Sequence, residues 1–288
     1  MSESQVTREG LKGLRPGREA PVDDTTVRRR RGGRRRRGEQ PMVPDAEFRS
    51  YYGLPVLNKP VWSPLDIAGY LFLGGLAGAS SVVAAVAEVQ AQDELARVAK
   101  VGAGSAAVLS LMGLVHDLGK PSRFVNMLRI FKVTSPMSVG SWLLAAYAPS
   151  ALTAAASDVT GRLKPVGAVA TGGAALLGPA VASYTSALIS DTAVPAWHDG
   201  YREMPFVFVG SAALAAGGLG LLGAPTAQHG LPRRIALAGG AVEIGMQQVM
   251  ERRLGMVAEP YRKGHAGRLM KAGKGLASPH SSTPWQKR

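Results

Sequence analysis

The residues of this chain that can carry protons or hydrogen-bond a polar ligand are few, and they stand at the borders of apolar segments. His116 and Asp117 follow the uncharged stretch 101–115 and precede Gly119 and Pro121, residue types that end helices. A histidine at such a boundary titrates in the physiological range. The pair therefore suggests proton uptake at a membrane surface.

A plainer interpretation of the same pair stays open. His116 would then be an interfacial residue, and Asp117 would anchor the end of its helix through salt bridges to the following loop. The cations that could hold its carboxylate ionised are Lys120 and Arg123.

Three further side chains are candidates for chemistry at membrane depth. Asp66 and Tyr70 are four residues apart and share one helix face, although a charged helix start with an interfacial tyrosine explains them equally well. Glu243, with Gln247 one turn later, lies near the middle of the last apolar segment. Because ionisable groups inside a membrane are costly, Glu243 has either a paired structural role or a role in proton handling.

The elements that must position these residues are apolar helices. A membrane-spanning helix needs about 20 mostly apolar residues. Six stretches come close to or meet this length, namely 65–89, 98–115, 136–157, 166–190, 206–223 and 235–250. They predict an all-α integral membrane protein, a bundle of about six transmembrane helices. Lys100, near the start of the second stretch, is expected to snorkel toward the membrane surface.

Charge divides the chain into three parts. The net charge is +14, yet residues 51–250 hold 12 Lys and Arg against 10 Asp and Glu, so most of the excess belongs to the ends. We expect a basic, Pro/Gly-rich disordered tail over 1–60, a helix bundle over 61–255 and a basic tail over 256–288. The positive-inside rule places both tails in the cytoplasm and the bundle in the cell membrane.

The arginine run at 27–41 carries eight Arg without an aromatic residue to stack on bases. Such a run is typical of a tail that attracts anionic lipids or fixes topology, and we expect no nucleic-acid partner. The bilayer itself is the expected partner of the bundle.

Redox groups bound through cysteine are excluded. The chain has no Cys, and its histidines other than His116 fall in predicted loops or tails, which argues against a b-type haem held between helices. Helix contacts are expected to rely on small residues such as Gly74 and Gly78, and Pro179 is expected to kink its helix.

Three stretches together resemble the polysulfide reductase membrane-subunit family, often called NrfD-like. They are YLFLGGLAGAS at 70–80, LVHDLGKPSRFVNMLRIFKVTSPMSVGSW at 114–142 and SYTSALISDTAVPAWHDGYREMPFVFVGSA at 183–212. The resemblance covers roughly residues 48–265. It implies a membrane subunit of a respiratory oxidoreductase that uses menaquinone or ubiquinone as an exchangeable substrate and holds no haem or iron–sulfur cluster. Electrons would pass to or from an iron–sulfur ferredoxin-like subunit, linked to a molybdenum or tungsten catalytic subunit of polysulfide reductase or formate dehydrogenase type.

The resemblance also implies where the quinone binds. In this family the pocket lies within the first helices and is lined by polar side chains, which map here onto Asp66, Tyr70, His116, Asp117 and Tyr184. Reduction of a quinone needs hydrogen bonds to its oxygens and two protons for two electrons, and these residue types can supply both. We expect His116 and Asp117 to act in proton transfer. We also consider Glu243 a candidate quinone-binding residue.

The sequence departs from the family in one way. Relatives usually have about eight helices, so the chain is expected to lack the last two, as a naturally short or a truncated member.

Two other hypotheses about function remain. A small-solute or proton-coupled transporter would use Glu243, Pro179 and the Gly-rich helices, although no paired broken helices are visible. A purely structural tether is the third hypothesis, and the sequence leaves open whether the chain counts as an enzyme.

Overall fold

The computed structural model describes residues 5–7, 10–12, 62–118 and 122–277. Most of the predicted tail at 1–60 and the end of the predicted tail at 256–288 lie outside these residues. Near the N-terminus, the strands β1 (Gln5–Thr7) and β2 (Gly10–Lys12) pair antiparallel, with Gln5 opposite Lys12.

All other described elements are helices. The long ones are α2 (Pro64–Val89), α3 (Asp93–Asp117), α5 (Pro136–Thr160), α6 (Lys164–Ser190), α8 (Met204–Gly223) and α9 (Gly230–Leu254). The short ones are α4 (Ser122–Met127), α7 (Pro195–His198), η1 (Asp199–Arg202), η2 (Thr226–Gln228), η3 (Gly255–Ala258), α10 (Glu259–Arg262) and α11 (Gly264–Ala277).

Five of the six predicted segments lie in helices that are long and apolar enough to cross a membrane, namely α2, α3, α5, α6 and α8. The sixth segment, 235–250, is helical as part of α9. However, α9 carries Arg233 and Arg234 near its start and Arg252 and Arg253 in its last turn, and it is not among the candidate spans of the described residues. The prediction of an all-α integral membrane protein is confirmed, with five spans identified by length and composition.

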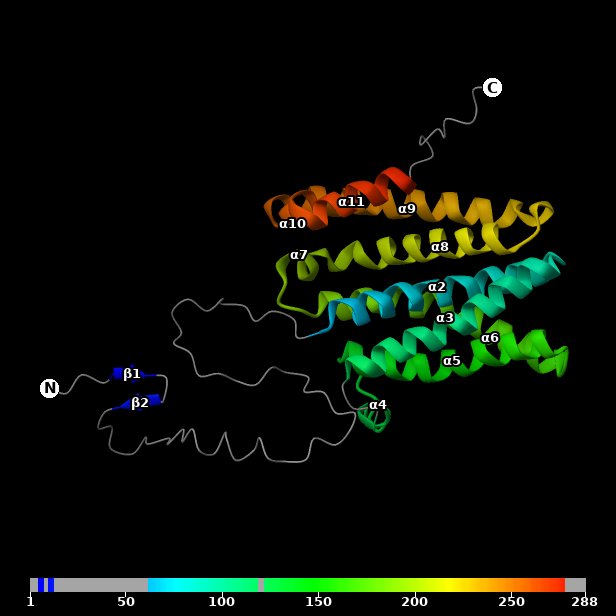
Figure 1. Ribbon diagram of the computed structural model, residues 1–288, viewed down its shortest axis with the longest axis horizontal. Coiled ribbons are helices and arrows are strands. Elements are labelled where there is room, and N and C mark those ends of the chain that lie inside the picture. The colour runs from blue at the N-terminus through cyan, green and yellow to red at the C-terminus, as the bar shows by residue number, and fades with distance from the viewer. Residues whose placement is uncertain (1–4, 8–9, 13–61, 119–121, 278–288) are drawn as a thin grey trace, which may run out of the picture.

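Helix α2 is the centre of the bundle. It contacts α3, α6 and α8, while α5 packs on α3 and α6, and α9 covers the outer side of α8 (Figure 1). Gly78 of α2 faces Gly178 of α6 so closely that a Cβ on either would lie within 3.0 Å of the other's carbonyl oxygen. The predicted close packing of α2 is therefore confirmed for Gly78, whose partner is α6, while Gly74 faces Ser110 of α3.

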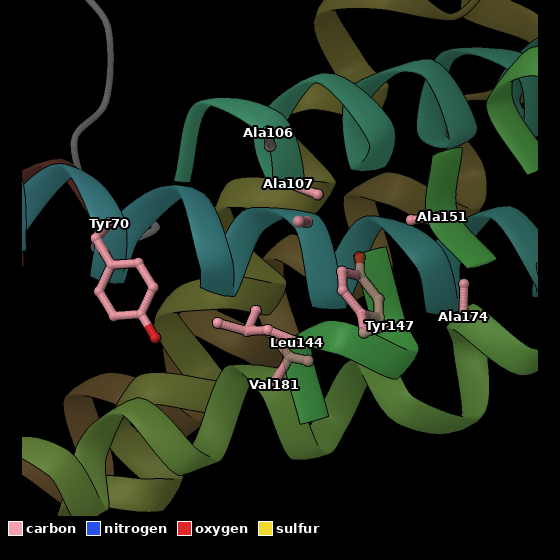
Figure 2. Packing of buried hydrophobic residues seen from close by; sticks show 9 residues of the cluster. Tyr70, Ala106, Ala107, Leu144, Tyr147, Ala151, Ala174 and Val181 are labelled. Atoms are coloured by element: carbon pink, nitrogen blue, oxygen red, sulfur yellow. The ribbon is translucent and has the colours of Figure 1, made fainter. Parts of the chain in front are cut away.

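The core between α2, α3, α5 and α6 is built mainly from alanines and two tyrosines. Tyr70 and Tyr147 are each 1% exposed, and the buried side chains around them are mostly those of small residues (Figure 2). The Tyr147 hydroxyl lies 2.8 Å from the Ser81 hydroxyl, so this buried phenol is hydrogen-bonded within the core.

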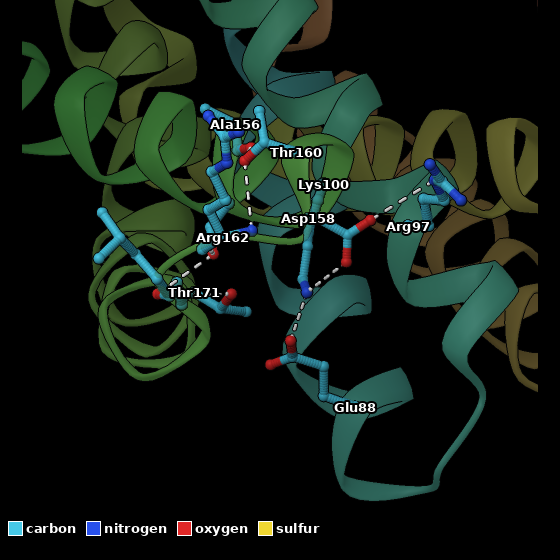
Figure 3. A network of polar contacts seen from close by, with 11 residues as sticks. Glu88, Arg97, Lys100, Ala156, Asp158, Thr160, Arg162 and Thr171 are labelled. Atoms are coloured by element: carbon cyan, nitrogen blue, oxygen red, sulfur yellow. Dashed lines mark hydrogen bonds and ion pairs between the residues drawn. The ribbon is translucent and has the colours of Figure 1, made fainter.

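The bundle has two ends, which we call the entry end, where α2 begins, and the far end, where α2 finishes. Because the six long helices run alternately up and down, α9 finishes at the entry end (Figure 1). At the far end, Lys100 donates to Asp158 at 3.0 Å and pairs with Glu88, and Arg97 lies 3.6 Å from Asp158 (Figure 3).

The prediction that Lys100 snorkels is wrong. Lys100 is 8% exposed and points into the bundle, where it joins α2, α3 and α5 through the two carboxylates. Helix α3 begins at Asp93 rather than near 98, so Lys100 stands two turns inside the helix, and the acids that hold it come from neighbouring helices.

Candidate functional site

The first feature of the entry end is a link between the start of α2 and the end of α3. Ser63 caps α2, with Pro64 in the first turn of the helix, a position that needs no N–H donor. The backbone N–H of Ser63 donates to Oδ1 of Asp117 at 2.8 Å. Asp117 therefore joins the two helices through a charge-assisted hydrogen bond, while the side chains of its predicted partners Lys120 and Arg123 lie outside the described part of the chain.

The second feature is a histidine–carboxylate pair. Nδ1 of His116 lies 2.9 Å from Oδ2 of Asp66, which is an ion pair whenever the imidazole is protonated. The His116 side chain is 65% exposed and that of Asp66 is 22% exposed. The histidine is thus open to its surroundings, while the carboxylate, on the inner side, fixes the orientation of the ring.

The third feature lies one turn deeper. The hydroxyl groups of Tyr70 on α2 and Tyr184 on α6 are in hydrogen-bond contact, and Ser110 on α3 donates to the carbonyl oxygen of Tyr70 at 3.0 Å. Tyr70 is fully buried, whereas Tyr184 is half-buried. Two phenols bring two O–H donors and use one of them in the contact between them, so, as far as the described residues go, one donor is left for a ligand.

The structure thus brings five of the six predicted site residues to one end of the bundle, and it does not bring in the sixth. Glu243 lies on α9, where its backbone packs against Gly210 of α8. Helix α8 stands between α9 and α2 (Figure 1). One carboxylate oxygen of Glu243 is buried and has no hydrogen-bond partner among the described residues.

Sequence reasoning missed three contributors to this end. Ser63 was detectable, because Ser followed by Pro is the signature of a capped helix start. The stacked rings of Trp62 and Trp197, 6.1 Å between centroids and 9° from parallel, were not, because nothing in the sequence pairs residues so far apart. This stack attaches the segment before α2 to α7.

An ion pair outside the five apolar helices joins the end of α9 to the residue before α8 at the entry end. Nε and Nη2 of Arg253 donate to the two carboxylate oxygens of Glu203 at 2.6 Å each, and Nη2 also donates to the carbonyl oxygen of Asp199. The hydrogen bonds from Arg253 hold the pKa of the Glu203 carboxyl below its usual value, although burial of the carboxyl opposes them. Nearby, Tyr261 donates to the carbonyl oxygen of Ala196 at 3.0 Å, and burial raises the pKa of Tyr261 to about 12.

The arrangement suits proton transfer and hydrogen bonding. Groups that carry exchangeable protons lie at different depths, because His116 is exposed and Tyr70 is buried. Asp66, which contacts His116, lies one turn before Tyr70 on the same helix. Within the ranges that the structure covers, no three His, Asp or Glu side chains gather as metal ligands.

One comparison with known proteins identifies the family of the chain. A family model described as polysulphide reductase, NrfD, matches residues 54–223, more than half of the 288 residues. A search of curated proteins gives no match. The matched range includes the five residues gathered at the entry end and stops before Glu243.

Proposed function

Because the chain belongs to the polysulphide reductase NrfD family, and so is a membrane subunit of a quinone-linked oxidoreductase, we propose that it passes electrons between a membrane quinone and an iron–sulfur partner subunit. The quinone head group would bind at the entry end of the bundle. The proposal for the other subunits is an iron–sulfur ferredoxin-like protein and a molybdenum or tungsten catalytic subunit, of polysulfide reductase or formate dehydrogenase type.

The observation that carries the proposal is the tyrosine pair beside the histidine–carboxylate pair. Tyr70 and Tyr184 hold one unused O–H donor within the bundle, and a quinone presents carbonyl oxygens that accept such a bond. A neutral donor at this depth suits a neutral ligand that dissolves in lipid. His116 and Asp66 lie one turn nearer the surface, where protons must arrive.

Reduction of a quinone to a quinol requires two electrons and two protons. The iron–sulfur partner would supply the electrons, and the protons would reach the site through His116, the most exposed of the group. Asp66 would orient the imidazole through their 2.9 Å contact, and Asp117 would keep α3 fixed to the start of α2, so that the histidine stays in reach. Quinol oxidation would use the same groups in reverse.

Access from the lipid is the route that the packing supports. The interior cavity beside Ser81, Lys100 and Thr171 has a volume of about 10 Å³, the size of one water, and lies toward the far end. A quinone ring cannot enter there. At the entry end, by contrast, Tyr184 is half-buried and Leu65 is 83% exposed, so a ring could approach between the helices while its tail stays in the bilayer.

Docking of the partner subunits would take place on the same end. Arg129 and Lys132 are exposed between α4 and α5, where they could meet an acidic surface. We place this end in the cytoplasm, on the positive-inside rule. The proposal covers both menaquinone and ubiquinone, and binding assays with each would distinguish them.

The test compares the two tyrosines of the pair with Tyr147, a third tyrosine of the same core. Tyr70→Phe and Tyr184→Phe each remove a hydroxyl of the pair, and Tyr147→Phe removes one that bonds only Ser81 in the same core. With the protein in nanodiscs, we expect short-chain menaquinone and ubiquinone analogues to bind the double variant Tyr70→Phe, Tyr184→Phe about tenfold more weakly, the cost of one buried hydrogen bond, because each single variant still has one O–H donor. Tyr147→Phe should bind as the wild type does. Equal affinities of the double variant and the wild type would refute the site.

The transporter hypothesis receives little support from the helices. Binding sites of that class use helices broken at mid-membrane. Here α5 continues through Pro149 and α6 continues through Pro179. Uptake of a solute by proteoliposomes that contain this chain alone would reverse that judgement.

A further inference from the structure

The stretch SPMSVGSW contains a glycine that touches the tyrosine pair. Gly140 is a buried residue of α5 and lies against the ring of Tyr184. A Cβ at position 140 would be nearer than 3.0 Å to Cε2 and Cζ of that ring and 2.5 Å from its hydroxyl oxygen. Real Cβ atoms essentially never approach other atoms so closely, so the ring occupies the place where any other residue would have a side chain.

The contact fixes the reactive end of Tyr184 rather than its base. The ring end rests on the bare backbone of α5, and its hydroxyl meets that of Tyr70 on α2. If a methyl group pushed the ring outward, Tyr70 could not follow, because it is 1% exposed and packed in the core. The two hydroxyls would then separate.

We propose that Gly140 is a positioning residue: its missing side chain seats the ring of Tyr184 so that the Tyr70–Tyr184 pair forms and presents its spare donor to the quinone. The formation of the pair stands on geometry alone, and its effect on quinone binding rests on the proposed function above.

Gly140 is a tightly packed glycine whose neighbour is the side chain of a site residue, Tyr184. Gly78 and Gly178 meet backbone atoms, so they set the distance between helices. Gly102 of α3 meets the side chain of Leu219, at a contact that includes none of the site residues. Gly102→Ala is therefore the matched control, since it too places a methyl group nearer than 3.0 Å to a neighbouring side chain.

A quinone-independent experiment tests the seat itself. The thermal stabilities of the wild type, Tyr70→Phe, Tyr184→Phe and the double variant give the coupling between the two hydroxyls. The same cycle is repeated with Gly140→Ala and with Gly102→Ala in every protein. We expect coupling in the wild-type and Gly102→Ala backgrounds and none in the Gly140→Ala background. Coupling that survives Gly140→Ala, or that is absent from the wild type, overturns the inference.

A second experiment tests the link to quinone. Gly140→Ala should weaken binding of the quinone analogues about tenfold, as loss of one hydrogen bond does. In a Tyr184→Ala background, where the methyl group has room, it should have no further effect, and Gly102→Ala should have none in either background. An equal loss with and without the Tyr184 ring would mean that Gly140 acts on helix packing, against the inference.

Two further outcomes separate the proposals. If the wild type binds no quinone analogue, the proposed function fails, and the coupling experiment still decides whether Gly140 seats Tyr184. If Gly140→Ala does not fold, the double variant Gly140→Ala, Tyr184→Ala should fold, because the clash is gone. If the double variant also fails to fold, the result contradicts the inference that Gly140 makes room for the ring of Tyr184.

Discussion

At the far end of the bundle, Lys100 lies between Glu88 and Asp158, and Arg97 stands beside the second carboxylate, so two acids meet two bases. At the entry end, His116 meets one carboxylate while remaining 65% exposed. Tyr70 and Tyr184 there bond each other and keep a donor unused.

The difference teaches which polar groups at a helix end are available for chemistry. Charges that satisfy each other inside the bundle hold helices together, and they have nothing left to offer a ligand. Groups that are only partly satisfied, beside a half-open surface, can bind and exchange protons. Saturation of hydrogen bonds, more than the number of charges, distinguishes the cluster around Lys100 from the groups of the proposed site.

The largest effect is expected at the far end. Lys100→Met leaves Glu88 without its cation and Asp158 with Arg97 alone, so we expect a loss of about 3 kcal/mol in stability, as for other broken buried pairs. Thermal unfolding in nanodiscs measures it, and quinone affinity should not change. Lys263→Met is the control, because Lys263 is 77% exposed in its pair with Glu259 and should cost below about 0.5 kcal/mol. Equal losses of stability in both variants would mean that the buried Lys100 cluster contributes no more than an exposed ion pair.

A smaller effect, on activity rather than stability, is expected at the entry end. His116→Gln keeps a polar side chain but cannot carry a proton, so quinone-linked electron transfer by the assembled complex should fall about 100-fold. Glu88→Gln, at the far end, should leave turnover per folded molecule unchanged. Turnover that survives His116→Gln would remove the histidine from the proton route.

The third prediction concerns acid stability. The pKa of Glu203 is lowered by Arg253, so their ion pair contributes stability that is complete above the unfolded value of about 4.3 and is lost as pH falls through the lower folded value. Glu203→Gln should lose about 1 kcal/mol near neutral pH and show a flatter dependence of melting temperature below about pH 5. Glu259→Gln, in an exposed pair, should keep the wild-type slope. A wild-type slope in Glu203→Gln would contradict the assignment.

The smallest effect is expected at the start of α2. Ser63→Ala removes a hydroxyl that accepts the N–H of Asp66 at 3.5 Å, a long bond, so the loss should be about 0.5 kcal/mol. The backbone N–H that Asp117 accepts is kept, and quinone affinity should therefore stay the same. A clear loss of affinity would mean that the hydroxyl itself belongs to the site.

Much of the fold was predictable from local patterns. Long uncharged runs predicted the five apolar helices, and Gly74 with Gly78 predicted close packing of α2. The spacing of Asp66 and Tyr70 placed both on one face. These features depend on residues within one helix, which is why the sequence reveals them.

The pairings between helices were not predictable in the same way. His116 and Asp66 are 50 residues apart, and Tyr70 and Tyr184 are 114 apart, so only the assembled bundle brings them together. The resemblance to a family named these residues as a group but gave no partners. The same limit explains the error on Lys100, whose two acids lie on other helices, and the candidacy of Glu243, which α8 separates from the rest.

The place of α2 at the centre has a consequence for how the protein is made. Among the described helices α2 leaves the ribosome first, yet its glycine contact with α6 and its tyrosine contact with Tyr184 must wait for a segment about 100 residues later. At 5–20 residues per second this delay is on the order of ten seconds. During that interval lipid must cover the glycine face of α2 and then leave it, so the nascent chain acquires its chemistry only when the fourth apolar helix is released.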